Sequence, residues 1–175
     1  MSELTDQLVE TWAIHGRIVL YVLDAIPAEA LTGVGATEKG RRVGAQFAHL
    51  HNVRLMWLKS ASPTLLDGLA SIEAANTSDK DMLRQGLDAS AAAIGSLLRQ
   101  ALESNGKIKG FKPHAAAFAG YLIAHESFHL GDIGVILTQS GHPLEKKVAY
   151  GVWESTTIDF SRQLALTVRQ GFRAR

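Results

Sequence analysis

The sequence predicts an all-α protein, a four-helix bundle with a short extra helix near its C-terminus. Three observations predict it: apolar residues recur near a 3.6-residue period in four long segments, breaker residues separate these segments, and no stretch alternates as a strand would. With 175 residues, 46% of them hydrophobic and 20% charged, the chain has the size and composition of one globular domain. We therefore expect a single domain over residues 1–175.

The first two helices are predicted over residues 4–25 and 41–60, where apolar side chains recur every three or four positions. Pro27 ends the first helix, because a proline inside a helix loses a hydrogen bond and clashes with the preceding turn. The glycine-rich stretch 27–40 is predicted to be a loop, and Pro63 closes the second helix.

The third helix is predicted to begin after Thr77 and Ser78 and to run to about Glu103. Thr77 and Ser78 are the predicted N-cap residues, because a hydroxyl oxygen accepts a hydrogen bond from an unpaired backbone N–H. Asp79 and Asp81 follow in the first turn, where negative charge suits the helix dipole.

The fourth helix is predicted over residues 115–138, in a long apolar segment. It ends before Gly141 and Pro143, a C-terminal cap glycine followed by a proline that cannot continue the helix. A shorter helix is predicted over residues 156–170, where apolar residues recur once more.

Composition excludes several classes of function. A net charge of +1 provides no long-range field for nucleic acid or anionic lipid, and no apolar run approaches the roughly 20 residues that span a bilayer. The first residues lack the basic start and apolar stretch of a signal peptide, so we expect a cytoplasmic protein. The chain has no cysteine, so metal binding falls to His, Asp and Glu.

The chemistry is concentrated on the fourth helix, where His125 and His129 stand at i and i+4 and therefore share one face. Such a pair can chelate one metal ion. Histidines in apolar helices are also often hydrogen-bonded inside a core without any metal. Here an unpaired imidazole would cost about 1–3 kcal/mol through desolvation, and a shared metal ion removes that cost.

A tight site needs a third ligand, and the second helix offers His49 and His51. Their side chains point about 200° apart around the helix axis, so only one of them can face the fourth helix. Periodicity weakly favours His49, but His51 could equally be the inward residue, and the other histidine is then expected at the surface. Three histidines with water at the other positions would form an open site of the catalytic type.

Four segments of the chain resemble the DinB-like (YfiT-like) family: residues 8–31, 43–50, 125–131 and 150–153. In that family one histidine on the second helix joins a His-x-x-x-His pair on the fourth. The second-helix ligand of the family corresponds to His49.

The resemblance implies a bundle in up-down-down-up order, commonly a homodimer, with zinc, nickel or a similar divalent ion held by His49, His125 and His129. Some relatives are S-transferases that hold a low-molecular-weight thiol on the metal, which implies transfer of a small thiol to an electrophile. This chain departs from the family pattern His-x-x-x-His-Arg-Gly-Gln, because Leu130 and Asp132 replace the Arg and the Gln.

Two other functions stay open. One is a non-catalytic metal-binding or dimerising protein of stress physiology. The other is a metallohydrolase, because His125-Glu126-Ser127-Phe128-His129 spells the His-Glu-x-x-His signature in which the glutamate activates water. Val135 stands where the extended form of that signature needs a third histidine. Glu126 is expected to orient an imidazole, to act as a base beside the metal, or to lie solvated off the ligand face.

The C-terminal segment contains more large apolar residues than a four-helix core needs to enclose. They are Val148, Tyr150, Val152, Trp153, Ile158 and Phe160. We expect this surplus to form the interface of a homodimer with Trp153 near its centre. The alternative is that the segment folds back and covers its own bundle.

Overall fold

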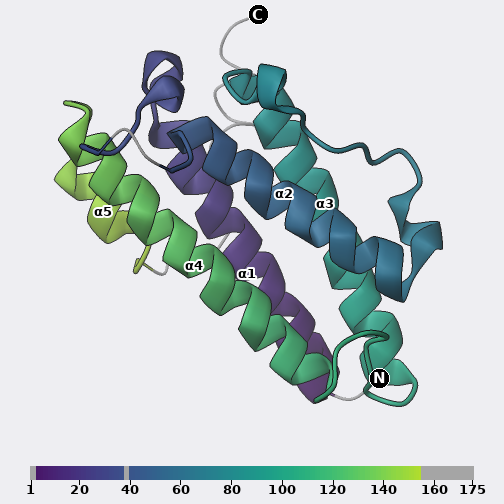
Figure 1. Cartoon of the computed structure of the whole chain (residues 1–175). Coiled ribbons are helices and arrows are strands. Elements are labelled where there is room, and N and C mark those ends of the chain that lie inside the picture. Colours follow the sequence, from purple (N-terminus) through teal and green to yellow (C-terminus); the bar gives the residue numbers. More distant parts are fainter. Residues whose placement is uncertain (1–2, 38–39, 155–175) are drawn as a thin grey trace, which may run out of the picture.

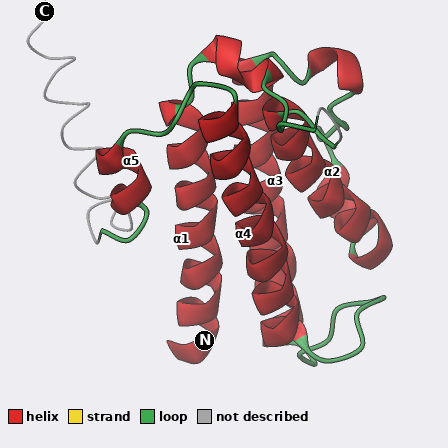
Figure 2. Ribbon diagram, turned by 60° about the vertical axis from the view of Figure 1, so that its left-hand side comes forward, coloured by secondary structure: helices red, strands yellow, loops and turns green. Residues whose placement is uncertain are grey.

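The computed structural model describes residues 3–37 and 40–154, and this part of the chain is built from helices (Figures 1 and 2). The four long helices are α1 (Glu3–Ala25), α2 (Val43–Ala61), α3 (Lys80–Glu103) and α4 (Ala115–Gln139). A short helix, α5 (Lys146–Gly151), follows α4, and the connections contain the 3-10 turns η1 (Ala28–Thr32), η2 (Pro63–Leu66) and η3 (Ala74–Asn76). The described residues contain no strand, which confirms the predicted fold class.

The four long helices follow the up-down-down-up order. The side chain of Lys80, at the start of α3, donates to the carbonyl oxygens of Asp24 and Ile26, at the end of α1. At the opposite end of the bundle, Arg99 of α3 donates to Asp6 of α1 over 2.8 Å, so α1 and α3 are antiparallel. Figure 1 shows α2 and α3 running in the same direction, and the connection between them returns along the bundle.

The predicted cap of α3 is wrong by one or two residues. Asp79 is the N-cap, because its side chain accepts a hydrogen bond from the backbone N–H of Met82 over 2.9 Å. Thr77 lies before the helix and donates its hydroxyl to the carbonyl oxygen of Ala74. The helix predicted over residues 156–170 lies outside the described residues.

The second helix starts in close contact with the connection that follows it. A Cβ placed on Gly44 would overlap the carbonyl group of Thr77, so glycine is required here by the close approach of two backbones. This contact fixes the start of α2 against the residues that lead into α3.

The core consists of two apolar clusters at different heights of the bundle. One contains Val19, Phe47, Leu87 and Ile133, and the other contains Trp12, Leu58, Leu98, Phe118 and Leu122. Between them lies a polar layer with one buried residue from each long helix: His15, Arg54, Ser90 and Glu126.

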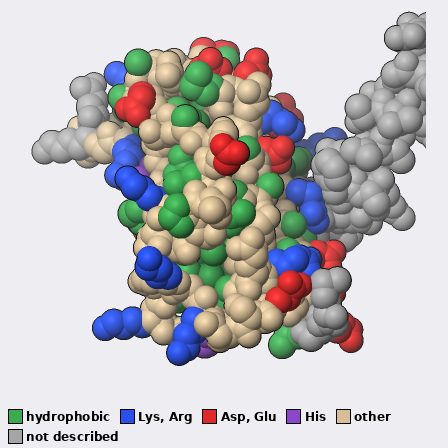
Figure 3. Space-filling model, turned by 90° about the vertical axis from the view of Figure 1, so that its right-hand side faces the viewer, with side chains coloured by type: hydrophobic (Ala, Val, Ile, Leu, Met, Phe, Trp, Pro, Cys, Tyr) green, Lys and Arg blue, Asp and Glu red, His purple; other side chains and the backbone are tan. Residues whose placement is uncertain are grey.

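The described surface is mixed in character. Figure 3 shows Lys and Arg side chains and Asp and Glu side chains on the same face, among apolar and neutral ones. This agrees with the formal net charge of +1. In the part of the chain that the structure describes, no helix is both long and apolar enough to cross a membrane.

Candidate metal centre

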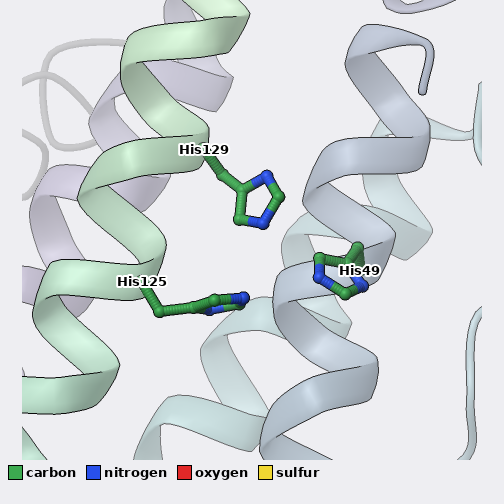
Figure 4. Close-up of side chains that lie close together, drawn as sticks. All are labelled: His49, His125 and His129. Carbon is green, nitrogen blue, oxygen red and sulfur yellow. The ribbon is translucent and has the colours of Figure 1, made fainter. Parts of the chain in front are cut away.

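Three histidines from two helices meet between α2 and α4. One ligand nitrogen from each of His49, His125 and His129 lies within 4.8 Å of those from the other two. The ring centroid of His49 is 5.4 Å from that of His125 and 4.8 Å from that of His129, and the two rings of α4 are 4.8 Å apart. Figure 4 shows the rings of His125 and His129 projecting from α4 toward α2, and the ring of His49 beside α2. The three residues predicted from the sequence therefore come together, and they could hold a metal ion.

The second histidine of α2 belongs to a different part of the molecule. The ring nitrogens of His51 lie 2.8 Å and 2.9 Å from the carbonyl oxygens of Gly86 and Ala70, on α3 and on the connection before it. The side chain is 1% exposed, so the expectation that the other histidine lies at the surface is wrong. His49 and His51 point in different directions, as their spacing requires: His49 is partly buried beside α4, whereas His51 is fully buried against α3 and the connection before it.

Two of the three imidazoles are held in the form that a metal ion needs. Burial, the charge of Arg41 and the neighbouring histidines lower the pKa of His49 to about 4. Burial, with His125 and Arg41, also lowers the pKa of His129. Both imidazoles are therefore neutral at pH 7, as metal coordination requires. The Nδ1 atom of His125 is buried and has no hydrogen-bond partner in the described part of the chain, which fits a ring whose partner comes from outside the protein.

Comparison with known proteins gives one match. The model of the DinB family matches residues 1–157. The chain belongs to the DinB family. The match includes all five helices, and therefore every residue of the histidine cluster. The search of curated proteins and the search of solved structures found no match.

In this DinB-family chain, Gln46 and Asp132 orient His129. The side-chain amide of Gln46 donates to the carboxylate of Asp132, so its carbonyl oxygen Oε1 faces His129. The Nδ1–H of His129 donates to this oxygen over 2.5 Å, which leaves the lone pair of Nε2 free for a metal ion. Asp132, one of the two positions that depart from the pattern expected from the resemblance, thus contacts the residue that orients His129. Sequence analysis missed Gln46, although its position one turn before His49 was a usable signal.

Glu126 does not take part in the histidine cluster. Its carboxylate accepts hydrogen bonds from Arg54 over 2.8 Å and 2.6 Å and from Nε2 of His15 over 2.8 Å. Burial alone would raise the pKa of Glu126, but the charge and hydrogen bonds of Arg54, with those of His15, lower it to about 2.

A carboxylate whose oxygens are occupied by Arg54 and His15, and whose pKa is about 2, is a weak base, so the structure argues against the role that the His-Glu-x-x-His signature gives to Glu126 in a metallohydrolase. The expectation of a solvated Glu126 is also wrong, because this residue is 1% exposed. It does orient an imidazole, but that imidazole belongs to His15, which is not in the cluster.

Aromatic side chains flank the cluster. The ring of Tyr121 stacks on that of His125 at 6.1 Å, and the ring of Phe128 meets that of His129 edge-on at 5.8 Å. Tyr121 and Phe128 are both exposed, and Phe128 reaches 74%. Trp57 packs against Tyr121 from the α2 side with ring centroids 5.9 Å apart. The cluster is therefore flanked by apolar rings that reach solvent, an arrangement suited to an apolar part of a small ligand.

Proposed function

We propose that this DinB-family protein binds one divalent metal ion, zinc or nickel, through His49, His125 and His129, and transfers a small thiol to an electrophile at that site. The observation that carries the proposal is the convergence of three imidazoles whose ligand nitrogens lie within 4.8 Å of one another. Within the described residues, no carboxylate or fourth histidine joins this group. Three protein ligands leave coordination positions for a small molecule, as in catalytic zinc sites.

The chemistry of the ligands supports this choice of metal. Imidazole nitrogens suit zinc, nickel and other divalent transition metals, whereas magnesium and calcium prefer oxygen ligands. When bound, the cation would stabilise the thiolate form of an incoming thiol, which is the nucleophilic form. The chain itself has no cysteine, so no thiol of its own competes for the open position.

The surrounding residues would prepare the site for this reaction. Gln46 holds the His129 ring in the tautomer whose Nε2 is unprotonated. The positive charge of Arg41 lowers the pKa of His49 and His129, and the same charge would favour an anionic thiol at the metal. Tyr121 and Phe128 provide apolar contact area for the rest of the ligand.

The first experiment tests the metal site. Protein purified without a histidine tag should contain about one divalent ion per chain by elemental analysis, and His49→Ala, His125→Ala and His129→Ala should each lose it. His142→Ala is the matched control, because this histidine lies outside the cluster. Full metal content in all three ligand variants would refute the site.

The second experiment tests thiol binding. The cobalt-substituted protein should gain a sulfur-to-metal charge-transfer band on addition of one of mycothiol, bacillithiol, glutathione or coenzyme A. A thiol-consumption assay with the same four compounds and a set of electrophiles would then identify the reaction. If none of the thiols produces the band, the protein binds the metal without this chemistry.

A further inference from the structure

The polar layer between the two apolar clusters connects all four long helices. It consists of His15 of α1, Arg54 of α2, Ser90 of α3 and Glu126 of α4, and Arg54 is 0% exposed. A fully buried guanidinium and a buried carboxylate are rare in a core, because removing a charge from water is costly. Their presence at mid-height of the bundle therefore requires an explanation.

Each polar group in the layer has partners. The guanidinium of Arg54 donates through Nε and one terminal nitrogen to the two carboxylate oxygens of Glu126, at 2.8 Å and 2.6 Å. Its other terminal nitrogen donates to the carbonyl oxygen of Leu87 over 2.8 Å and to the Ser90 hydroxyl over 3.3 Å, both on α3. His15 of α1 donates to Glu126 over 2.8 Å. The guanidinium is thereby held in one orientation.

The strongest contact of the layer joins the two helices that hold the histidine cluster. Arg54 lies about one and a half turns after His49 on α2. Glu126 directly follows His125 and lies on the same helix as His129. Because the arginine fork meets the carboxylate through two hydrogen bonds, it restricts the distance and rotation between α2 and α4 at this height.

Stability alone does not account for the pair. Replacing a buried ion pair by well-packed apolar residues of similar volume is often neutral or stabilising, because the desolvation cost can exceed the attraction. Apolar contacts, however, tolerate small changes in the rotation and spacing of the helices, whereas a bidentate pair does not. A metal site needs such a fixed spacing, since its ligand nitrogens must all reach one ion.

We propose that Arg54 and Glu126 are positioning residues that set the spacing of α2 and α4 so that His49 meets His125 and His129. They act through the helices and do not touch the ion. The inference rests on the proposed metal site, but its structural part concerns the metal-free chain and can be tested there.

The test uses the double variant Arg54→Met/Glu126→Gln. It removes both charges, approximately keeps the volume and leaves an amide as a partner for His15. The variant should retain its helical circular dichroism and cooperative unfolding, but its affinity for zinc should fall by about 10- to 100-fold. The visible spectrum of its cobalt form should also change. Leu98→Ala is the matched control: it should lower the unfolding temperature through a cavity in the core but leave zinc affinity unchanged.

A second measurement reads the helix spacing without any metal. Because the chain has no cysteine, Lys59→Cys on α2 and Gly120→Cys on α4, at the same end of the bundle, introduce the only two sites for thiol-specific spin labels. Both positions are exposed. The distance distribution between the labels should be narrow in the otherwise unchanged protein and in Leu98→Ala, and it should broaden or shift in Arg54→Met/Glu126→Gln.

Wild-type zinc affinity or an unchanged distance distribution in the folded double variant would overturn the proposal. If the double variant does not fold, Arg54→Lys replaces it, because lysine keeps the charge but cannot form the two-pronged contact. Arg54→Lys should show the same loss of affinity and the same broadening, and wild-type behaviour would again overturn the proposal. If the unsubstituted protein binds no metal, the proposed function fails, while the spin-label distances still decide whether the pair sets the spacing.

Discussion

Replacing Gln46 by leucine should weaken metal binding although Gln46 is not a ligand. The substitution approximately keeps the volume of a buried side chain, but it removes the oxygen that accepts the Nδ1–H of His129 over 2.5 Å. Neutral His129 can then move its proton to Nε2, which removes the lone pair that would face the metal. The ring also loses the contact that holds it in place, because Gln46 no longer connects it to Asp132.

The expected magnitude follows from the kind of contact that is lost. Removing the hydrogen-bond partner of a metal-bound histidine typically costs about 10- to 100-fold in affinity. This corresponds to about 1.4–2.7 kcal/mol of binding free energy. If the proton stays on Nδ1, the buried donor lacks an acceptor, which should lower the free energy of unfolding by about 1–3 kcal/mol.

Zinc affinity measured by competition with a chromophoric chelator, together with urea unfolding of the metal-free protein, separates the two effects. The control is the exchange variant Gln46→Glu/Asp132→Asn. Its carboxylate at position 46 can accept hydrogen bonds from both His129 and the new amide, so the exchange should recover most of the lost affinity. Wild-type affinity in Gln46→Leu would refute the reasoning. A folded exchange variant that binds no better than Gln46→Leu would refute it as well.

Four further predictions concern stability and assembly. The metal-free protein should lose stability as the pH falls from 7 to 5, measured by urea unfolding. The reason is that unfolded His49 takes up a proton near its ordinary pKa of 6.5, whereas folded His49, with a pKa of about 4, stays neutral. The His49→Gln variant should lose less stability over the same pH range. Gly44→Ala should lower the free energy of unfolding by about 1–3 kcal/mol, because its Cβ overlaps the carbonyl group of Thr77. Gly120→Ala, whose Cβ meets nothing, should raise it by about 0.5–1 kcal/mol. We also propose a homodimer formed through the C-terminal segment, where Trp153 is 80% exposed. Light scattering should give twice the monomer mass for the unsubstituted protein. Trp153→Glu should reduce the measured mass to that of the monomer and retain the helical content.

The helices and the α4 pair could be predicted because local rules determine them. Periodicity and the prolines placed the long helices to within about two residues, and any helix carries residues at i and i+4 on one face. The choice between His49 and His51 could not be made in this way, because α2 is buried on two sides. His49 faces α4, while His51 faces α3 and the connection before it. A one-sided apolar pattern, on which the periodicity argument depends, is absent in such a helix.

The polar layer was missed for a different reason. Charged residues in amphipathic patterns are usually solvated, so nothing local distinguished Arg54 from a surface residue, and the signature around Glu126 pointed to the metal and not to Arg54. Their burial depends on partners from other helices, at sequence separations of 72 residues for Arg54 and Glu126 and 111 for His15 and Glu126. Gln46 was missed for the same reason: the sequence shows that it lies one turn before His49, but its contact with Asp132 depends on the packing of α2 against α4.

The polar layer also has a consequence for folding kinetics. An ionised side chain loses its hydration when it is buried. Here Arg54 is compensated by groups on α3 and α4, and Glu126 by groups on α1 and α2, so the layer is complete only after all four helices have docked. Its contacts should therefore be largely absent from the transition state for folding. Interactions of this kind slow unfolding more than they accelerate folding. We expect the layer to lengthen the lifetime of the native bundle, even where its contribution to equilibrium stability is small.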